Sequence, residues 1–358
     1  GGTMMKMSKW TIISVISALA VGAIVLVVIY FQESGKLKTA ESEIVTLEGD
    51  VSTLEGNVST IEGTVSTLET ALAAAEAEVA RLEENVSALE AELAPVTFPD
   101  ADLEVAIREA LSNSEGPINK LHLEGITMLE ASEWGIRNLT GLEYCVNLQE
   151  LSLTQNNISD ISALASLTNL EHLNLNFNNI SDISALASLT NLEHVHLDFN
   201  NISDISALAS LTNLEHVHLD FNNISDISAL ASLANLEHLR LGDNNISDIS
   251  ALVSLTNLWG LNLDFNNISD ISALASLTNL QTLGLPGNNI SDISALASLT
   301  NLEWLDLMSN NISDISPLVE NSGLSAGNTV YLSGNPLSTT SVNAYIPQLE
   351  ERGVYIMY

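Results

Sequence analysis

The stretch NLEHLNLNFNNISDISALASLT, residues 169–190, decides the fold of this chain. Eight copies of this 22-residue unit follow one another without a gap. Each copy begins with an asparagine: Asn147, Asn169, Asn191, Asn213, Asn235, Asn257, Asn279 and Asn301. A second asparagine recurs in the tenth place of every copy: Asn156, Asn178, Asn200, Asn222, Asn244, Asn266, Asn288 and Asn310. A strict period of this length predicts that each copy is one structural unit stacked on the next.

The spacing inside one unit predicts its shape. Leu173 and Leu175 are expected to point inward from a short strand, with Asn174 between them pointing outward. Asn178 is expected to end the strand in a tight turn and to satisfy backbone groups there. The chain then returns through a short convex segment, in which Asp182 or Ser184 caps a brief helical turn. One unit cannot bury its apolar side alone, so the copies must share one core.

The fragment L-x-x-L-x-L-x-x-N-x-I is the leucine-rich-repeat signature. It predicts an α/β solenoid, a horseshoe with a parallel β-sheet on its concave face. We expect an N-terminal helical cap at residues 96–125, repeats at 126–323, and a last degenerate repeat with a C-terminal cap at 324–358. Asp100 would cap the first helix, which would bury Leu103, Ile107, Ala110 and Leu111. At the other end, Ser338 would begin a helix that Gly353 stops, before a closing strand at residues 354–358.

Residues 98–358 resemble the repeat region of bacterial internalin-type surface proteins. The resemblance lies in the N-x-I-x-D-I-x-x-L pattern at residues 178–186, in FPDADLEVAIREAL at 98–111 and in GNPLSTTSVNAYIPQLEERGVYIMY at 334–358. It implies recognition of proteins or glycans at a cell surface, without catalysis and without a cofactor.

A short tail at residues 1–9 precedes an uncharged, mostly apolar run that begins at Trp10 and ends at Gln32. As a helix, these residues 10–32 would span roughly 34 Å, enough for a membrane core of about 30 Å. A transmembrane helix is therefore expected; a cleaved signal peptide, with a cleavage site near Ala18 and Ala20, is the alternative. The small basic N-terminus and the acidic remainder favour a cytoplasmic N-terminus, with the bulk of the chain at the cell surface.

A heptad pattern runs through residues 40–94, with apolar residues in both core positions. It predicts a coiled-coil stalk about 75 Å long. Every e position is glutamate: Glu48, Glu55, Glu62, Glu69, Glu76, Glu83 and Glu90. A parallel homodimer would place these like charges along its flanks, so only weak association is expected. Two roles remain open, a spacer and a helix that pairs with a partner carrying basic flanks.

Charge and cysteine content exclude several functions. The chain of 358 residues has 45 acidic and 10 basic residues, a formal net charge of −35. Nucleic acid is therefore excluded as a main partner, because phosphates require Lys and Arg. One cysteine excludes an internal disulfide framework and a CxxC site. Cys145 aligns with leucines of later copies and is expected to be buried. No catalytic motif is present, so we do not expect an enzyme.

The outward strand positions form three columns and hold six of the seven histidines. From these columns and the flanking aromatics we predict a ligand-binding set: His172, His194, His196, Asp198, His216, His218, Asp220, His238, Arg240, Asn262, Asp264 and Trp304. Four of its histidines would form a near-square suited to a divalent metal, namely His194, His196, His216 and His218. Duplication of nearly identical copies explains such a ladder without a metal. Titration of the imidazoles, which would make binding pH-dependent, is a third reading.

Two further ladders accompany the columns. Phe177, Phe199, Phe221 and Phe265 precede the turn asparagine and are expected to pack together at the solenoid edge, mainly as core, with exposed edges as possible anchors for a partner. An aspartate ladder is expected to cap the convex turns. The function that follows is binding of a protein or glycan by the concave face of a membrane-tethered protein. A structural envelope component without a dedicated ligand is the alternative.

Overall fold

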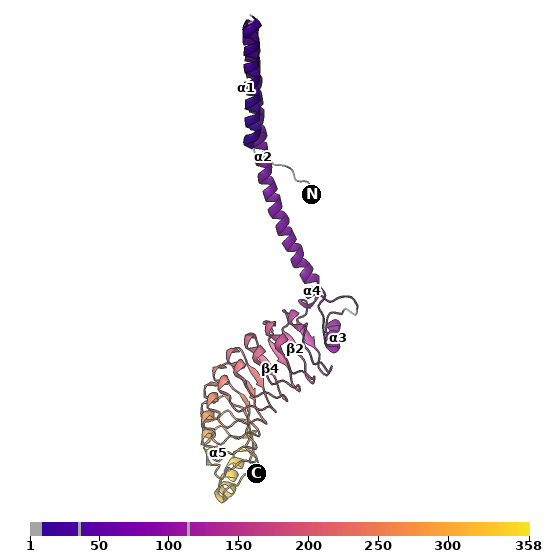
Figure 1. The fold of residues 1–358 in the computed structure, drawn as a ribbon. Helices are drawn as coiled ribbons and strands as arrows, with labels where there is room; N and C mark the ends of the chain where they lie inside the picture. The colour runs from indigo at the N-terminus through magenta and orange to yellow at the C-terminus, as the bar shows by residue number, and fades with distance from the viewer. Residues whose placement is uncertain (1–8, 35–36, 113–114) are drawn as a thin grey trace. The chain divides into compact units, whose positions relative to one another are not determined.

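The computed structural model describes residues 9–34, 37–112 and 115–358 (Figure 1). The chain divides into two compact units, Gly1–Leu89 and Glu90–Tyr358. The first is helical and the second contains the repeats, and each is considered by itself below.

The N-terminal unit contains the helix α1, Lys9–Ser34, and most of the helix α2, Leu37–Leu93. The expected apolar run, residues 10–32, lies within α1. In the part of the chain that the structure describes, no helix combines the length and apolar character needed to cross a membrane. The transmembrane helix predicted at residues 10–32 is therefore not supported by the structure.

Helix α2 is continuous through the heptad region. Its core-position side chains are largely exposed on the single chain: Leu54 is 52% exposed, Ile61 61% and Leu68 62%. The helix also passes through three glycines, where hydroxyls of Thr53, Thr60 and Thr67 donate hydrogen bonds to the glycine carbonyls one turn earlier. A long helix with an exposed apolar stripe is thus observed, whereas its pairing into a coiled coil stays a prediction.

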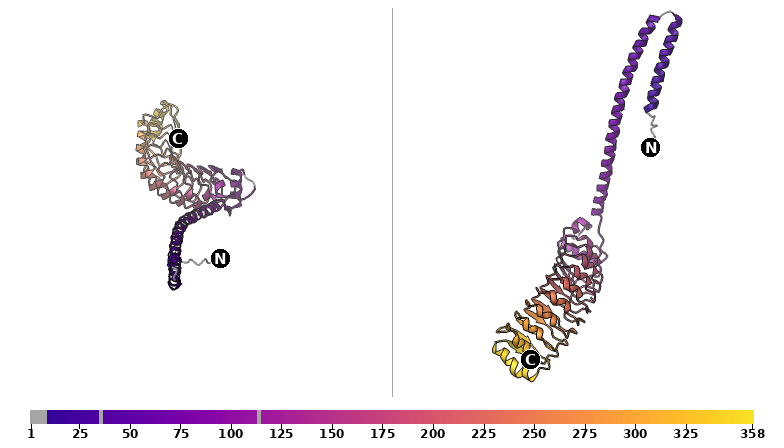
Figure 2. Two further views of the ribbon diagram at one scale, coloured as in Figure 1. Left: turned by 90° about the horizontal axis from the view of Figure 1, so that it is seen from above. Right: turned by 90° about the vertical axis from the view of Figure 1, so that its left-hand side faces the viewer.

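The second unit is a solenoid with one eleven-stranded parallel sheet, whose strands follow chain order (Figures 1 and 2). The strands are β1 Met128–Glu130, β2 Glu150–Ser152, β3 His172–Asn174, β4 His194–His196, β5 His216–His218, β6 His238–Arg240, β7 Gly260–Asn262, β8 Thr282–Gly284, β9 Trp304–Asp306, β10 Thr329–Tyr331 and β11 Tyr355–Met357. From β1 to β9, paired residues lie 22 positions apart, as Leu151 and Leu173 do. The repeat length therefore sets the register, and the predicted solenoid is confirmed.

The convex side of the solenoid consists of short 3-10 helices, one in each repeat. They are η1 Leu142–Tyr144, η2 Ser162–Ser166, η3 Ser184–Ser188, η4 Ser206–Ser210, η5 Ser228–Ser232, η6 Ser250–Ser254, η7 Ser272–Ser276 and η8 Ser294–Ser298, followed by the α-helix α5, Ser316–Glu320. At the start of η3 the Asp182 carboxylate accepts a hydrogen bond of 2.8 Å from the Ser184 N–H. The same bond recurs in every copy, which confirms the capping role of the aspartate ladder.

The turn asparagines hold consecutive repeats together inside the core. Asn200 is 7% exposed, and its Oδ1 accepts from the N–H of Ile180 in the preceding repeat. Its Nδ2 donates to the carbonyls of Leu175 and Leu197. Each buried amide thus satisfies backbone groups in two repeats, which are costly to leave unpaired. The role predicted for these asparagines is confirmed.

Both ends of the apolar stack are covered. The N-terminal cap contains α3, Ala101–Ala110, and α4, Lys120–Leu123. Asp100 caps α3 as predicted, and its second carboxylate oxygen accepts from the N–H groups of Arg137 and Asn138 in the first turn of the solenoid. The predicted buried face is wrong at one place. Ala110 is exposed and Ala106 is buried instead, because Leu103, Ala106 and Ile107 share the stripe that meets the repeats.

The C-terminal cap ends the sheet. A π-helical turn, η9 Ser341–Tyr345, continues into α6, Ile346–Glu351. The Ser338 hydroxyl accepts from the Ser341 N–H, which confirms the predicted start of this segment. Gly353 has φ of +88°, a conformation that favours glycine, and it turns the chain into β11.

Candidate binding face of the repeat domain

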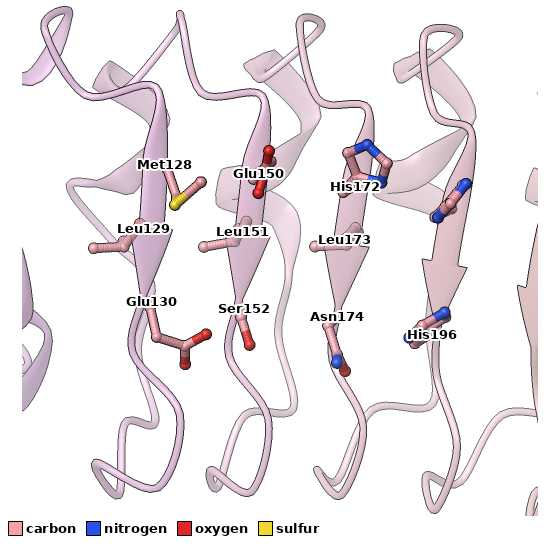
Figure 3. Close-up of a pocket in the computed structure, with 11 residues that line it drawn as sticks. Met128, Leu129, Glu130, Glu150, Leu151, Ser152, His172, Leu173, Asn174 and His196 are labelled. Carbon is pink, nitrogen blue, oxygen red and sulfur yellow. The ribbon is translucent and has the colours of Figure 1, made fainter.

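The strand register assembles the predicted columns. His172, His194, His216 and His238 are successive partners across β3 to β6, and Asn174, His196, His218 and Arg240 form the next row along the same strands. Their side chains stand on the face opposite the buried leucines, as His172 and Asn174 show in Figure 3. Neighbouring strands lie about 4.8 Å apart, so side chains in one row must touch.

The histidines touch mainly by stacking. The rings of His196 and His218 are parallel within 5°, with centroids 4.1 Å apart. The rings of His194 and His216 stack at 4.4 Å, and His172 meets His194 edge-on at 4.5 Å. One polar contact joins the rows, between Nε2 of His218 and Nδ1 of His238 at 3.2 Å.

This packing keeps the histidines neutral. Burial lowers the pKa of His196 to about 4 and that of His218 to about 3, and the charges of neighbouring imidazoles lower them further. The pKa values of His194 and His238 are lowered as well, again chiefly by burial. The inner imidazoles therefore stay uncharged well below the pH at which a free histidine takes up its proton.

Asp198 and Asp220 lie beneath the face and not on it. They are 8% and 3% exposed, and each accepts a backbone N–H from the next repeat through Oδ1, at 2.7 Å. Nε of Arg240 donates to Oδ2 of Asp220 at 2.7 Å. Asn176 accepts the Asp198 N–H in the same way. The column that contains Asn176, Asp198 and Asp220 is therefore a ladder of backbone contacts, in which Asp220 is the carboxylate with a cationic partner.

Burial raises the pKa of several of these carboxyls. Desolvation, together with the charge of Asp220, brings the pKa of Asp198 to about 6. Desolvation also brings the pKa of Asp264 to about 6 and raises that of Asp306. Asn262 donates to one oxygen of Asp264 at 2.8 Å, while Oδ1 of Asp264 is buried without a hydrogen-bond partner. The face thus holds acidic groups that gain a proton at mildly acidic pH.

A groove of about 210 Å³ lies over the first four strands (Figure 3). Its polar wall comes from one glutamate in β1, one in β2, and the first histidines, and its floor is leucine. The lining residues are Met128, Leu129, Glu130, Glu150, Leu151, Ser152, His172, Leu173, Asn174, His194 and His196. Met128 and Glu130 are not among the predicted concave residues. They lie 22 residues before Glu150 and Ser152, so the same offset applied to the degenerate leading copy identifies them.

The four histidines considered for a metal do not converge on one point. Stacked rings place their nitrogens side by side, whereas a metal site needs nitrogens aimed at a shared centre. In residues 9–34, 37–112 and 115–358, as far as their side chains are described, no group of three or more His, Cys, Asp or Glu side chains is arranged to hold a metal ion.

The phenylalanine ladder lies on the surface beside the face. Phe177, Phe199 and Phe221 stack with centroids 4.3 and 4.1 Å apart, as predicted. Their assignment as mainly core is wrong, because they are 43%, 39% and 44% exposed and Phe265 is 57% exposed. All four have φ between +49° and +56°, a left-handed conformation that costs a bulky residue on the order of 1–2 kcal/mol. These rings therefore occupy a strained position while a large part of each side chain stays exposed.

Three further side chains near the face or in the core have clear surroundings. Trp304 is 36% exposed, and its ring centroid lies 5.9 Å from that of Tyr331. Trp259, at 37% exposure, packs beside His238. Cys145 is fully buried, and desolvation raises the pKa of its thiol to about 12, so this cysteine is part of the core.

Comparison with known proteins agrees with this architecture. A family profile described as leucine-rich repeats in two copies matches residues 146–188, 190–232, 234–276 and 278–320. No curated protein matches the chain. Among solved structures, the ectodomain of the plant receptor kinase GASSHO1/SCHENGEN3 of Arabidopsis thaliana, in complex with CASPARIAN STRIP INTEGRITY FACTOR 2, is 27% identical. The match has a TM-score of 0.50 and covers 60% of this chain and 27% of that one.

Two bacterial structures are more similar in sequence. Internalin C2 of Listeria monocytogenes is 40% identical, with a TM-score of 0.56, over 57% of this chain and 92% of that one. An internalin, InlF, of the same organism is 32% identical, with a TM-score of 0.52, over 73% of this chain and 91% of that one. These matches span nearly the whole of each relative, and the chain therefore belongs to the internalin-type leucine-rich-repeat proteins.

Proposed function

We propose that the repeat domain binds a protein partner through its concave face. The leucine-rich-repeat fold is a protein-interaction scaffold and typically not an enzyme. The observation that carries the proposal lies in how the copies differ. From β2 to β9 the inward middle residue of the strand is always leucine or valine and is buried. The outward residue before it is Glu150, then four histidines, then Gly260, Thr282 and Trp304.

This contrast separates folding from recognition. Packing demands the same apolar side chain at every inward position, because one continuous core is shared. No such demand acts on the outward positions, so they are free to be chosen for a partner. Of the predicted ligand-contacting set, the proposal keeps the side chains on the concave face and leaves out the buried Asp198 and Asp220. His172, His194 and His216 form its accessible row, and Trp304 is the aromatic anchor. The plant receptor structure, with its protein ligand, supports a protein over a glycan.

The test uses substitutions that other copies already carry. His194 and His216 become Thr, the residue at Thr282, and His196 and His218 become Asn, the residue at Asn174. Matched controls are Ala209→Ser and Ala231→Ser, exposed convex positions in the same two repeats. The full chain is used to probe a displayed library of extracellular protein domains and a glycan array, and the captured members are scored for wild type and both variants.

Protein binding at this face requires that the histidine variant loses capture while the convex control retains it. Equal capture by all three chains contradicts the proposal and favours a structural envelope component. Capture of glycans alone would transfer the proposal to the other ligand class. Circular dichroism of each variant verifies that the repeats remain folded.

We further propose surface display on a membrane anchor and a helical stalk, and this part rests on the amino-acid sequence alone. The basis is the uncharged run at residues 10–32 and the heptads at residues 40–94. Fractionation with an alkaline carbonate wash, followed by protease treatment of intact cells, tests anchor and orientation together. Release by carbonate, or protection of the repeats from protease, contradicts it.

A further inference from the structure

One row of side chains runs along the edge of the concave face, at the position just before each turn asparagine. Its members share a left-handed backbone, with φ between +49° and +68°. In chain order they are Gln155, Phe177, Phe199, Phe221, Asp243, Phe265, Gly287 and Ser309. The polar and glycine members show that the fold does not require an aromatic residue here.

The aromatic run has one internal break, at Asp243. Phe177, Phe199 and Phe221 cover one another's faces by stacking, so the free faces belong to the two ends of this run. Phe221 is the end that meets Asp243. Phe265 resumes the row on the other side and is the most exposed of the four. Its ring packs over Gly287, where an added Cβ would collide with it, so its opposite face is turned toward the Asp243 side.

The Asp243 carboxylate lies at this break without a partner of its own. Its backbone N–H donates to the Asp264 carbonyl, but no hydrogen bond or ion pair reaches its side chain from the described residues. Desolvation and the nearby charge of Asp220 raise its pKa. The site therefore has an unneutralised carboxylate with an aromatic ring on either side.

The chain itself has little to neutralise that charge. Residues 121–358 contain no lysine and only three arginines, Arg137, Arg240 and Arg352. Arg240 is held by Asp220, and Arg352 donates to the carbonyls of Val319 and Asn321. With a net charge of −35, the molecule attracts cationic surfaces at long range. Charge complementarity thus selects a basic partner.

We propose that the break at Asp243 binds an arginine side chain of a partner polypeptide, with the guanidinium between the rings of Phe221 and Phe265 and paired with the carboxylate. Two repeats at about 4.8 Å each separate the backbone positions of Phe221 and Phe265 by roughly 10 Å. A cation midway is then about 5 Å from either ring, within the roughly 6 Å over which cation–π attraction acts. Arginine fits better than lysine because its planar guanidinium can face an aromatic ring and donate to a carboxylate oxygen at the same time.

This inference rests on the proposed function, that the repeat domain binds a protein, and adds the chemistry of the partner. The test is isothermal titration of the full chain with a blocked tetra-arginine peptide. Tetra-citrulline, the neutral isostere, and tetra-lysine serve as ligand controls. Asp243→Asn removes the charge but tolerates the left-handed backbone. Phe265→Ser installs the residue found at Ser309. Glu320→Gln is the matched control, since it removes one exposed charge on α5.

Asp243→Asn is expected to weaken tetra-arginine binding about three- to fivefold and Phe265→Ser about threefold, as cation–π and ion-pair magnitudes suggest. Glu320→Gln should leave the affinity unchanged, citrulline should not bind, and lysine should bind more weakly than arginine. The proposal is overturned if Asp243→Asn and Glu320→Gln have equal effects, or if Phe265→Ser has none, because binding would then follow overall charge only.

The two proposals fail in different ways. If tetra-arginine does not bind while the histidine variant still loses its captured protein, the arginine site is refuted and the concave-face function stands. If tetra-arginine binds at Asp243 but the histidine variant loses no partner, the edge site stands and the concave face is not the binding surface.

Discussion

The imidazole rings of His196 and His218 stack face to face, with centroids 4.1 Å apart and ring planes within 5°. Neither ring can take a proton without placing a charge beside the other in a partly buried site. Burial is the main cause of the low pKa values, about 4 for His196 and about 3 for His218, and the charges of neighbouring imidazoles and of Arg240 add to it. It also gives the domain a definite response to acid.

We expect acid to destabilise the repeats through these two rings. The unfolded chain binds protons near pH 6.5, whereas the folded chain binds them only near pH 4 and 3, so stability falls as the pH drops below about 6.5. Replacing His196 and His218 by Asn, as at Asn174 and Asn262, should reduce the loss between pH 7.5 and pH 5. Urea unfolding of the full chain at both pH values measures this loss of unfolding free energy. If the variant loses as much stability as the wild type, the prediction is contradicted.

Asp198→Asn should stabilise the repeats at neutral pH and have little effect at acidic pH. The pKa of Asp198 is raised to about 6, so its charged form lowers stability above that pH, and the penalty disappears as the pH falls toward 4. Asparagine at the preceding copy, Asn176, accepts the same kind of backbone N–H. We expect the variant to gain about 1–2 kcal/mol of unfolding free energy at pH 7.5. This is less than the full free-energy equivalent of the pKa shift, because solvent screens part of the interaction. Urea midpoints should show the gain at pH 7.5 and its absence at pH 4.5. A gain of equal size at both values would mean that charge is not the cause.

Adjacent asparagines should differ sharply in their effect on stability. Asn200→Ala removes a buried amide that binds Ile180, Leu175 and Leu197, and should cost about 2–4 kcal/mol by leaving those backbone groups unpaired. Asn201→Ala, at the exposed neighbour, should change the unfolding free energy by less than about 0.5 kcal/mol. Chemical denaturation compares the two. Similar costs would show that the amide ladder does not stabilise the stack.

Phe199→Gln should leave the fold nearly unaffected. The substitution loses stacking with Phe177 and Phe221 but lessens the strain of a bulky left-handed residue, and Gln155 already occupies this position in an earlier copy. We expect a change within about 1 kcal/mol, against about 2–5 kcal/mol for Leu197→Ala in the core. Thermal and urea unfolding measure both. A large loss in Phe199→Gln would return the ladder to a structural role and weaken its assignment to binding.

Most of the fold could be predicted because every copy of the repeat gives the same structural information again. Leu173, Asn178 and Asp182 recur at fixed offsets, and each offset has one physical use, so inward strand, turn and cap followed directly. The candidate face was less predictable. The columns were identified, but Asp198 was taken for a ligand-contacting residue although it is buried beneath the face and accepts a backbone N–H.

The amino-acid sequence by itself determined the solenoid, its 22-residue register and which residues share a column, because a period decides neighbours without knowledge of coordinates. Tertiary structure decided how deep each side chain lies and which face of each ring is free. Phe177 and Leu175 are both apolar, yet one is exposed and the other fully buried. That difference depends on backbone curvature and on the turn conformation. Both arise only when neighbouring repeats pack, and neither is a property of a residue type.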